Sequence, residues 1–124
     1  MEHSRLVGSV VMVVEDEPLV GLDLVDMLEA AGAYVVSAKR AGEAISSLDR
    51  FEIAAAVLDI NLGDHNCSAV CEHLWKRDIP FLFYTGYSPT LGGWDNVPVL
   101  QKPAMPQEIV EAVERLCGSR QRAA

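Results

Sequence analysis

Several side chains that could do chemistry directly follow short apolar segments of the sequence. Glu15 and Asp16 follow one such segment, and Asp59 follows another. Thr85 and Lys102 each close a further segment. Carboxylates a few ångströms apart repel and raise one another's pKa values unless a cation lies between them. If the fold brings these residues together, we expect a site that binds a cation and an anionic group.

The ligand atoms that these residues offer are all oxygens, which suit a hard cation. A site with few carboxylates leaves positions for water or a phosphoryl oxygen, which favours Mg²⁺ over Ca²⁺, and the sequence has no EF-hand-type loop. Mg²⁺ beside Asp59, with the Thr85 hydroxyl and the Lys102 ammonium nearby, would supply the charge and donors that a transferring phosphoryl group requires. We therefore expect Asp59 to be a nucleophile that accepts phosphoryl.

These residues need a framework that brings the ends of separate segments together. Apolar segments of strand length alternate with stretches of helical period, which predicts a parallel sheet flanked by helices. Residues that follow parallel strands meet at the carboxyl edge of the sheet, where ligands bind in such folds. The predicted strands are at 10–14, 34–38, 53–58, 81–84 and 97–100.

Apolar residues at helical spacing predict four helices, with stripes at 20–31, 41–48, 67–74 and 109–117. Gly32 and Gly118 follow the first and last stripes, where helices commonly end. Glu17, next to Pro18, is expected to cap the first helix. Segment 86–94 contains Pro89 and a Gly-Gly pair, so we expect one or two turns there at most. The polar tail 119–124 is expected to be frayed.

Length and composition limit the function classes. The chain has 124 residues, 50% hydrophobic and 23% charged, which predicts one globular domain at 1–124 with a core at about 8–118 and flexible ends. A net charge of −8 opposes binding to nucleic acids or membranes. The cysteines Cys67, Cys71 and Cys117 form no Cys-x-x-Cys pair, which fits a reducing, cytoplasmic location. We expect Cys67 and Cys71 to pack rather than to bind metal.

The strand ends, in this order, resemble the receiver domain of two-component response regulators over residues 10 to 117. The resemblance implies the α/β class and a flavodoxin-like, doubly wound fold, with a five-stranded parallel sheet in the order 2-1-3-4-5, helices on both faces, and a fourth helix that is short or disordered. The motifs that carry it are Val13-Val14-Glu15-Asp16-Glu17, Val57-Leu58-Asp59-Ile60-Asn61-Leu62, Tyr84-Thr85-Gly86 and Gln101-Lys102-Pro103.

The resemblance implies a role for each site residue. Asp59 would accept phosphoryl, Asp16 would bind Mg²⁺ directly, and Glu15 would bind it through water. The remaining three would contact the ion or the phosphoryl group: Asn61 through its backbone carbonyl, Thr85 through its hydroxyl, and Lys102 through its ammonium. The Lys102-Pro103 bond is often cis in such domains.

Two features depart from the common receiver pattern. Receivers usually carry an aromatic residue three positions before the lysine, where this chain has Val99. The segment Phe83-Tyr84-Thr85-Gly86-Tyr87 resembles a subgroup with a Phe-x-Thr-Gly-Tyr signature, whose members often work with HWE-type histidine kinases. We hypothesise that Tyr87 substitutes for the missing aromatic residue and that segment 86–96 becomes ordered during signalling.

These observations predict a stand-alone receiver that is not an enzyme. Its partner is expected to be a sensor histidine kinase or a histidine phosphotransfer protein, with which it exchanges phosphoryl groups. Phosphorylation is expected to change its contacts with a downstream protein. A phosphatase of the haloacid dehalogenase type is disfavoured because Asn61 stands where a second Asp would be needed. A nucleotide or flavin module is disfavoured because Glu15-Asp16-Glu17 has the wrong charge for a phosphate loop. A receiver used for dimerisation or as an adaptor, without phosphorylation, is the alternative, and a homodimer is compatible with the sequence. The histidines His3, His65 and His73 lack metal-ligand spacing and are expected to be surface or helix residues.

Overall fold

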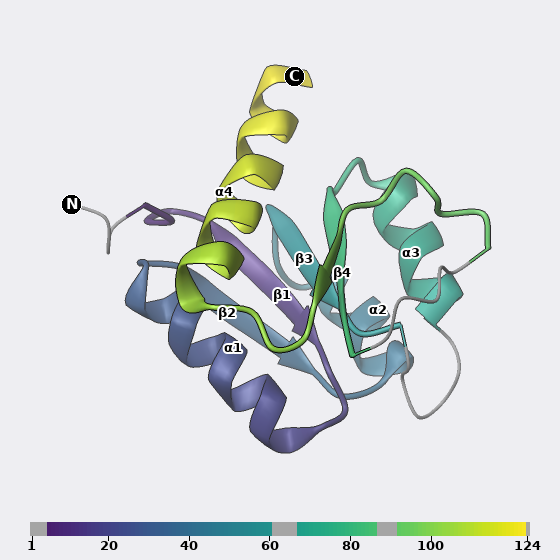
Figure 1. Cartoon of the computed structure of the whole chain (residues 1–124). Helices are drawn as coiled ribbons and strands as arrows, with labels where there is room; N and C mark the ends of the chain where they lie inside the picture. The colour runs from purple at the N-terminus through teal and green to yellow at the C-terminus, as the bar shows by residue number, and fades with distance from the viewer. Residues whose placement is uncertain (1–4, 61–66, 87–91, 124) are drawn as a thin grey trace.

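A parallel sheet forms the centre of the molecule (Figure 1). The computed structural model describes residues 5–60, 67–86 and 92–123. Within these ranges five strands form one sheet in the order β2-β1-β3-β4-β5, all pairs parallel, which confirms the predicted order. The strands are β1 (Val10–Val14), β2 (Tyr34–Ala38), β3 (Ala55–Leu58), β4 (Phe81–Thr85) and β5 (Val99–Gln101).

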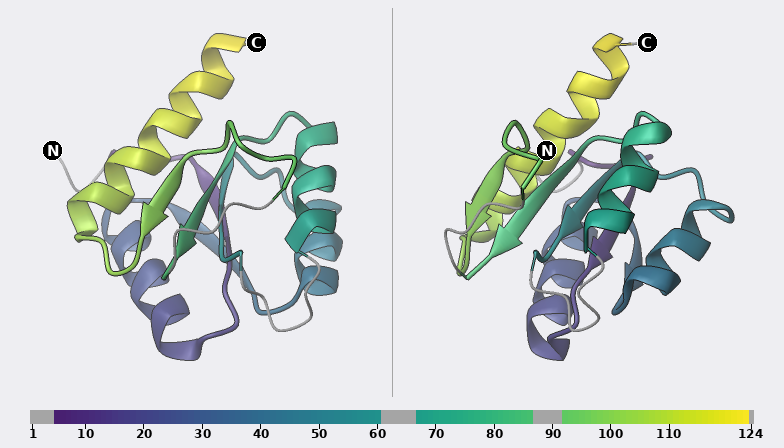
Figure 2. Two further views of the ribbon diagram at one scale, coloured as in Figure 1. Left: turned by 45° about the vertical axis from the view of Figure 1, so that its right-hand side comes forward. Right: turned by 90° about the vertical axis from the view of Figure 1, so that its right-hand side faces the viewer.

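Helices cover both faces of the sheet (Figure 2). The helices α1 (Pro18–Ala30) and α4 (Pro106–Ala123) lie on one face, and α2 (Ala41–Leu48) and α3 (Cys67–Lys76) lie on the other. Alternate residues of each strand therefore enter different cores. In β1, Val11 and Val13 pack with α1 and α4, whereas Met12 and Val14 pack with α2 and α3. None of the described helices combines the length and apolarity that crossing a bilayer requires.

The core on the α2 and α3 side contains the predicted cysteine pair. Cys67 and Cys71, one turn apart on α3, are free thiols, 3% and 0% exposed, among apolar residues. The hydrogen bond with the neighbouring Cys67 thiol, and then burial, raise the pKa of Cys71. Both cysteines are therefore packing residues, as predicted.

The connection between β4 and β5 is held against α3 by aromatic residues. No helix occurs in its described part, residues 86 and 92–98, and residues 87–91 of the segment in which at most one or two turns are expected lie outside the described residues. The Trp94 ring lies 5.7 Å from the Phe81 ring and 6.1 Å from the Trp75 ring, in edge-on contacts. Trp94 thus covers apolar surface of the core, while Trp75 remains 69% exposed.

Helix α1 begins and ends as the sequence predicts. The Glu17 side chain caps it by accepting a hydrogen bond from Leu19 N, and Pro18 occupies the first turn. Gly32, with φ of 101°, follows its end, in the left-handed conformation that glycine adopts without a steric penalty. The neighbouring segment is packed closely, since Leu6 is 1% exposed and its N–H donates to Ala31 O.

The expected end of the last helix at Gly118 is wrong. Helix α4 continues to Ala123, and its last turns extend past the sheet in both views of Figure 2. Gly118 has no positive φ, unlike Gly32. A glycine inside a helix costs only about 1 kcal/mol relative to alanine, which the flanking residues of a long helix can offset.

Two alanine substitutions at these glycines should have opposite effects on stability. Gly32→Ala forces a side chain into positive φ and places Cβ 2.5 Å from Val7 Cγ2, so we expect it to lower the free energy of unfolding by more than about 1 kcal/mol. Gly118→Ala meets open space in a helix, so we expect a gain of about 0.5–1 kcal/mol. Urea unfolding measures both, and a loss of stability in Gly118→Ala would contradict the continuous helix.

Candidate functional site

The candidate site lies at the carboxyl edge of the sheet, where three strands end side by side. Val14 pairs with Leu58 at the ends of β1 and β3, so the next residues, Glu15 and Asp59, become neighbours. Asp59 N donates to Val14 O, and Glu15 N donates to Ala38 O. These backbone bonds fix both carboxyl-bearing residues to the rigid sheet rather than to a loop.

Three of the predicted acids form one cluster. A carboxylate oxygen from each of Glu15, Asp16 and Asp59 lies within 4.8 Å of the other two. Glu15 and Asp59 are 4% and 6% exposed, whereas Asp16 is exposed to solvent. The predicted cluster is confirmed, and its two buried members lie where repulsion between carboxylates is poorly screened.

Lys102 bridges the two buried carboxylates. Its Nζ lies 2.8 Å from Glu15 Oε1 and 3.3 Å from Asp59 Oδ2, and its side chain is 20% exposed. Lys102 N donates to Thr85 O at 2.8 Å, which fixes its backbone beside the end of β4. The bond to Pro103 is cis. The structure therefore brings Lys102 to Asp59, a pair 43 positions apart in the chain.

The pKa values record how this cluster is balanced. Burial raises the pKa of Glu15, and the Asp59 charge adds to that effect, although Lys102 and the Glu17 N–H act in the opposite direction. Burial alone would lower the pKa of Lys102, but the Glu15 and Asp59 carboxylates outweigh it and raise that pKa. The surroundings thus favour the charged form of Lys102 and disfavour the charged form of Glu15.

The remaining predicted site residues have different outcomes. Thr85 is the last residue of β4 and is fully buried. Its carbonyl oxygen accepts the hydrogen bond from Lys102 N. Asn61 and Tyr87 lie outside the described residues. Val99, where receivers usually carry an aromatic side chain, sits on β5 and is 45% exposed.

Tyr84 is a residue near the site to which the sequence analysis assigned no role. It is 5% exposed, and its hydroxyl accepts a hydrogen bond from Ala104 N at 3.0 Å. Its ring centroid lies 5.7 Å from Lys102 Nζ. The one sequence signal that could have indicated a role is the tyrosine itself, which follows three apolar residues of the strand and directly precedes Thr85. A buried tyrosine usually finds a hydrogen-bond partner for its hydroxyl.

The donor set fits a hard divalent cation. Three carboxylates face one ammonium, so the cluster retains negative charge, and all the donors are oxygens. Glu15, Asp16 and Asp59 would hold such an ion. Bound there, Mg²⁺ would offset the carboxylate repulsion and attract a phosphoryl oxygen.

Neutralising Glu15 should stabilise the metal-free protein. Because the folded-state pKa of Glu15 lies above its ordinary value of 4.5, the wild type loses stability relative to Glu15→Gln as pH rises through that raised pKa. In EDTA, the urea-unfolding free energy of Glu15→Gln should exceed that of the wild type, and the difference should grow from acidic to neutral pH. Glu29→Gln, an exposed change on α1, should show no such pH dependence. A less stable Glu15→Gln protein at neutral pH would contradict the unfavourable charge.

Magnesium should stabilise the wild type through this cluster. At tenfold the dissociation constant, Mg²⁺ should add about 1.4 kcal/mol to the free energy of unfolding. Asp16→Ala should reduce that gain, whereas Asp23→Ala, which removes an exposed acid of α1, should retain it. Thermal unfolding with a magnesium titration measures this, and equal gains in all three proteins would contradict the site.

Comparisons with known proteins come from sequence and from structure. No family model matches the sequence. The sensor protein TorS of Escherichia coli (strain K12) is 32% identical over 85 residues, which are 68% of this chain and 9% of TorS. The crystal structure of the response regulator PhyR from Brucella abortus is 29% identical, with a TM-score of 0.83, over 98% of this chain and 53% of the PhyR chain. This chain thus spans only part of the length of either protein.

A further solved structure is a receiver domain with a bound metal ion. The receiver domain of sensor histidine kinase PA1611 from Pseudomonas aeruginosa PAO1 is 21% identical, with a TM-score of 0.77, over 90% of this chain and 98% of that domain. It was crystallised with a magnesium ion coordinated in its active site cleft. The structural neighbours are receiver domains of response regulators and sensor kinases, and this chain has their flavodoxin-like fold.

Proposed function

We propose that this chain is a phosphoacceptor receiver, in which Asp59 accepts a phosphoryl group with the help of Mg²⁺. The observation that carries the proposal is the position of Asp59: a buried carboxylate, 3.3 Å from the Lys102 ammonium, in a cluster of three acids. A buried nucleophile with a cationic partner and neighbouring carboxylates that could hold a metal is what phosphoryl transfer to a carboxylate requires.

The transfer forms one bond and breaks another. A carboxylate oxygen of Asp59 attacks the phosphorus of a phosphohistidine, the P–N bond breaks, and the imidazole leaves as it takes up a proton. The product is an acyl phosphate on Asp59 and a free histidine on the donor. The Lys102 ammonium faces the developing negative charge on the phosphoryl oxygens, and the Thr85 hydroxyl is the candidate donor to a further oxygen.

The metal ligands proposed here are Glu15, Asp16, Asp59 and the backbone carbonyl of Asn61. When bound, Mg²⁺ supplies positive charge that lets the anionic nucleophile and the anionic phosphoryl group approach. Asp16, the exposed acid, lies at the solvent side of the cluster, where an ion can enter. The magnesium described for the PA1611 receiver domain supports this assignment.

The donor proposed for this chain is a sensor histidine kinase, including the HWE type, or a histidine phosphotransfer protein. The similarity to TorS and to PhyR supports a place in two-component signalling. The output is a change in contacts with a downstream protein or onward transfer of phosphoryl. Turnover of external phosphate esters is not part of the proposal, because Asn61 cannot serve as the general acid of a phosphatase.

Acetyl phosphate with Mg²⁺ should add one phosphoryl group to the intact protein. Asp59→Asn should abolish the addition because an amide is not a nucleophile for phosphorus, whereas Asp49→Asn, at an exposed acid paired with Arg77, should leave it unchanged. Intact-mass spectrometry measures the addition. Undiminished labelling of Asp59→Asn would contradict the proposed nucleophile, and an absence of labelling in the wild type would contradict the proposed function.

A further inference from the structure

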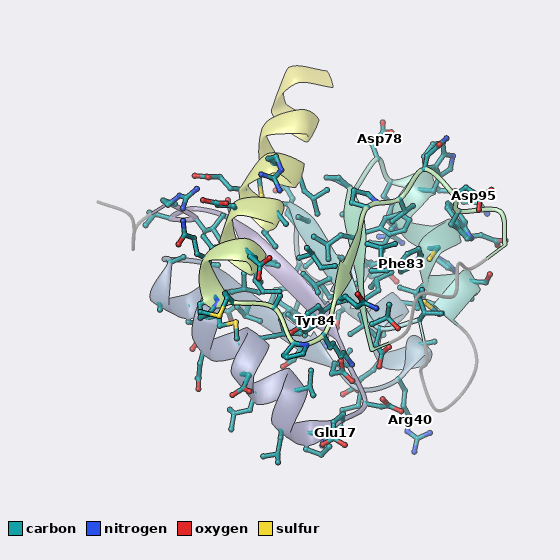
Figure 3. All side chains as sticks on the ribbon, viewed as in Figure 1. Glu17, Arg40, Asp78, Phe83, Tyr84 and Asp95 are labelled. Carbon is teal, nitrogen blue, oxygen red and sulfur yellow. The ribbon has the colours of Figure 1, made fainter. Side chains whose placement is uncertain are left out.

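Tyr84 differs from the three residues before it in β4, which are apolar, because it carries a hydroxyl into the core layer. Strand residues alternate between the two faces, and Figure 3 shows Phe83 and Tyr84 on opposite sides of β4. Phe83 packs with α2 and α3, and Tyr84 packs with α1 and α4. A phenylalanine at position 84 would satisfy the packing, so the hydroxyl needs a separate explanation.

The hydroxyl of Tyr84 binds the backbone that leads from β5 into α4. It accepts a hydrogen bond from Ala104 N at 3.0 Å, two residues beyond Lys102 and two before the start of α4 at Pro106. Ala104 itself is partly buried against the same core layer. The tyrosine therefore links β4 to the connection that carries Lys102.

The ring of Tyr84 contacts Lys102 directly. Its centroid lies 5.7 Å from Nζ, within the range in which an ammonium is attracted to an aromatic face. The neighbouring Thr85 O accepts from Lys102 N at 2.8 Å. Thr85 thus holds the backbone of Lys102, and the Tyr84 ring holds its ammonium. The Tyr84 hydroxyl holds the backbone of Ala104, two residues further on.

We propose that Tyr84 is a positioning residue for Lys102: its ring and its bond to Ala104 N hold the ammonium where it bridges Glu15 and Asp59. This inference rests on the proposed phosphoacceptor function, because the ammonium faces the phosphoryl group there. Val99, half-exposed on β5, has no comparable contact among those that the described residues show.

Two variants separate the parts of the tyrosine. Tyr84→Phe retains the ring and removes the bond to Ala104 N, whereas Tyr84→Leu retains apolar volume and removes both contacts. Val113→Ala is the matched control, since Val113 is fully buried in the same core layer on α4 and lies outside the site. It lowers stability without altering the surroundings of Lys102.

The first measurement is the NMR chemical shift of the Lys102 ε-methylene protons in the unphosphorylated protein. An ammonium held over an aromatic face places these protons in the ring current, which shifts them upfield. We expect the upfield shift in the wild type and in Val113→Ala, a smaller one in Tyr84→Phe, and none in Tyr84→Leu. An identical shift in the wild type and Tyr84→Phe would overturn the positioning role of the hydroxyl.

The second measurement is the rate of phosphorylation by acetyl phosphate, together with the Mg²⁺ affinity. We expect Tyr84→Phe to slow phosphorylation about 3- to 10-fold, the range that corresponds to one net hydrogen bond, and Tyr84→Leu to slow it further. The Mg²⁺ dissociation constant should change less than the rate does, because the contacts of Tyr84 with Ala104 N and Lys102 involve none of the proposed metal ligands. Val113→Ala should match the wild type in rate.

The outcomes separate the two proposals. A rate loss in Val113→Ala as large as in Tyr84→Phe would mean that Tyr84 acts only through stability, and would overturn its positioning role. Equal rates in the wild type and Tyr84→Phe would overturn it as well. If the wild type takes up no phosphoryl group, the proposed function fails, and the Lys102 proton shifts still decide whether Tyr84 positions the lysine.

Discussion

The contact on which the site depends is the Lys102 ammonium between the buried carboxylates of Glu15 and Asp59. Two carboxylates a few ångströms apart in a water-poor environment would repel strongly, and the shared cation makes the arrangement tenable. Glu15, Asp59 and Lys102 directly follow the strands β1, β3 and β5. These three strands must therefore end at the same edge of the sheet for the contact to form. In the order β2-β1-β3-β4-β5, β4 lies between β3 and β5, so the Lys102 side chain reaches past the end of β4 to Asp59.

Much of this arrangement could be predicted because its causes are local or periodic. Parallel strands buried on both faces have continuous apolar sequences, so the β1 range could be predicted to the residue. The range of the edge strand β2, which is partly exposed, was predicted to the residue as well. Polar residues directly after such strands must meet at one edge, so the acid cluster and Lys102 could be predicted too. The capping of α1 by Glu17 is equally local.

The parts that could not be predicted depend on contacts between distant residues. Whether a glycine ends a helix depends on its φ, which the residue type leaves open: φ is positive at Gly32 and not at Gly118. The close approach of Val7 to Gly32, which a Cβ would prevent, is likewise a contact between residues far apart in the chain. The bond from Ala104 N to Tyr84 joins residues 20 positions apart. The Arg5–Glu114 ion pair joins the two ends of the described chain, and such partners follow only from the completed fold.

The aromatic contacts of Trp94 with Phe81 and Trp75, on the face of the sheet that α2 and α3 cover, have a practical consequence for spectroscopy. The chain contains two tryptophans, and both take part in these contacts: Trp75 on α3 and Trp94 on the connection that leaves β4 just beyond Thr85. All intrinsic indole emission therefore originates beside this connection, and none originates near α1 or α4. Any change in fluorescence intensity that accompanies occupation of Asp59 would locate a rearrangement to this one side of the molecule, without an introduced label.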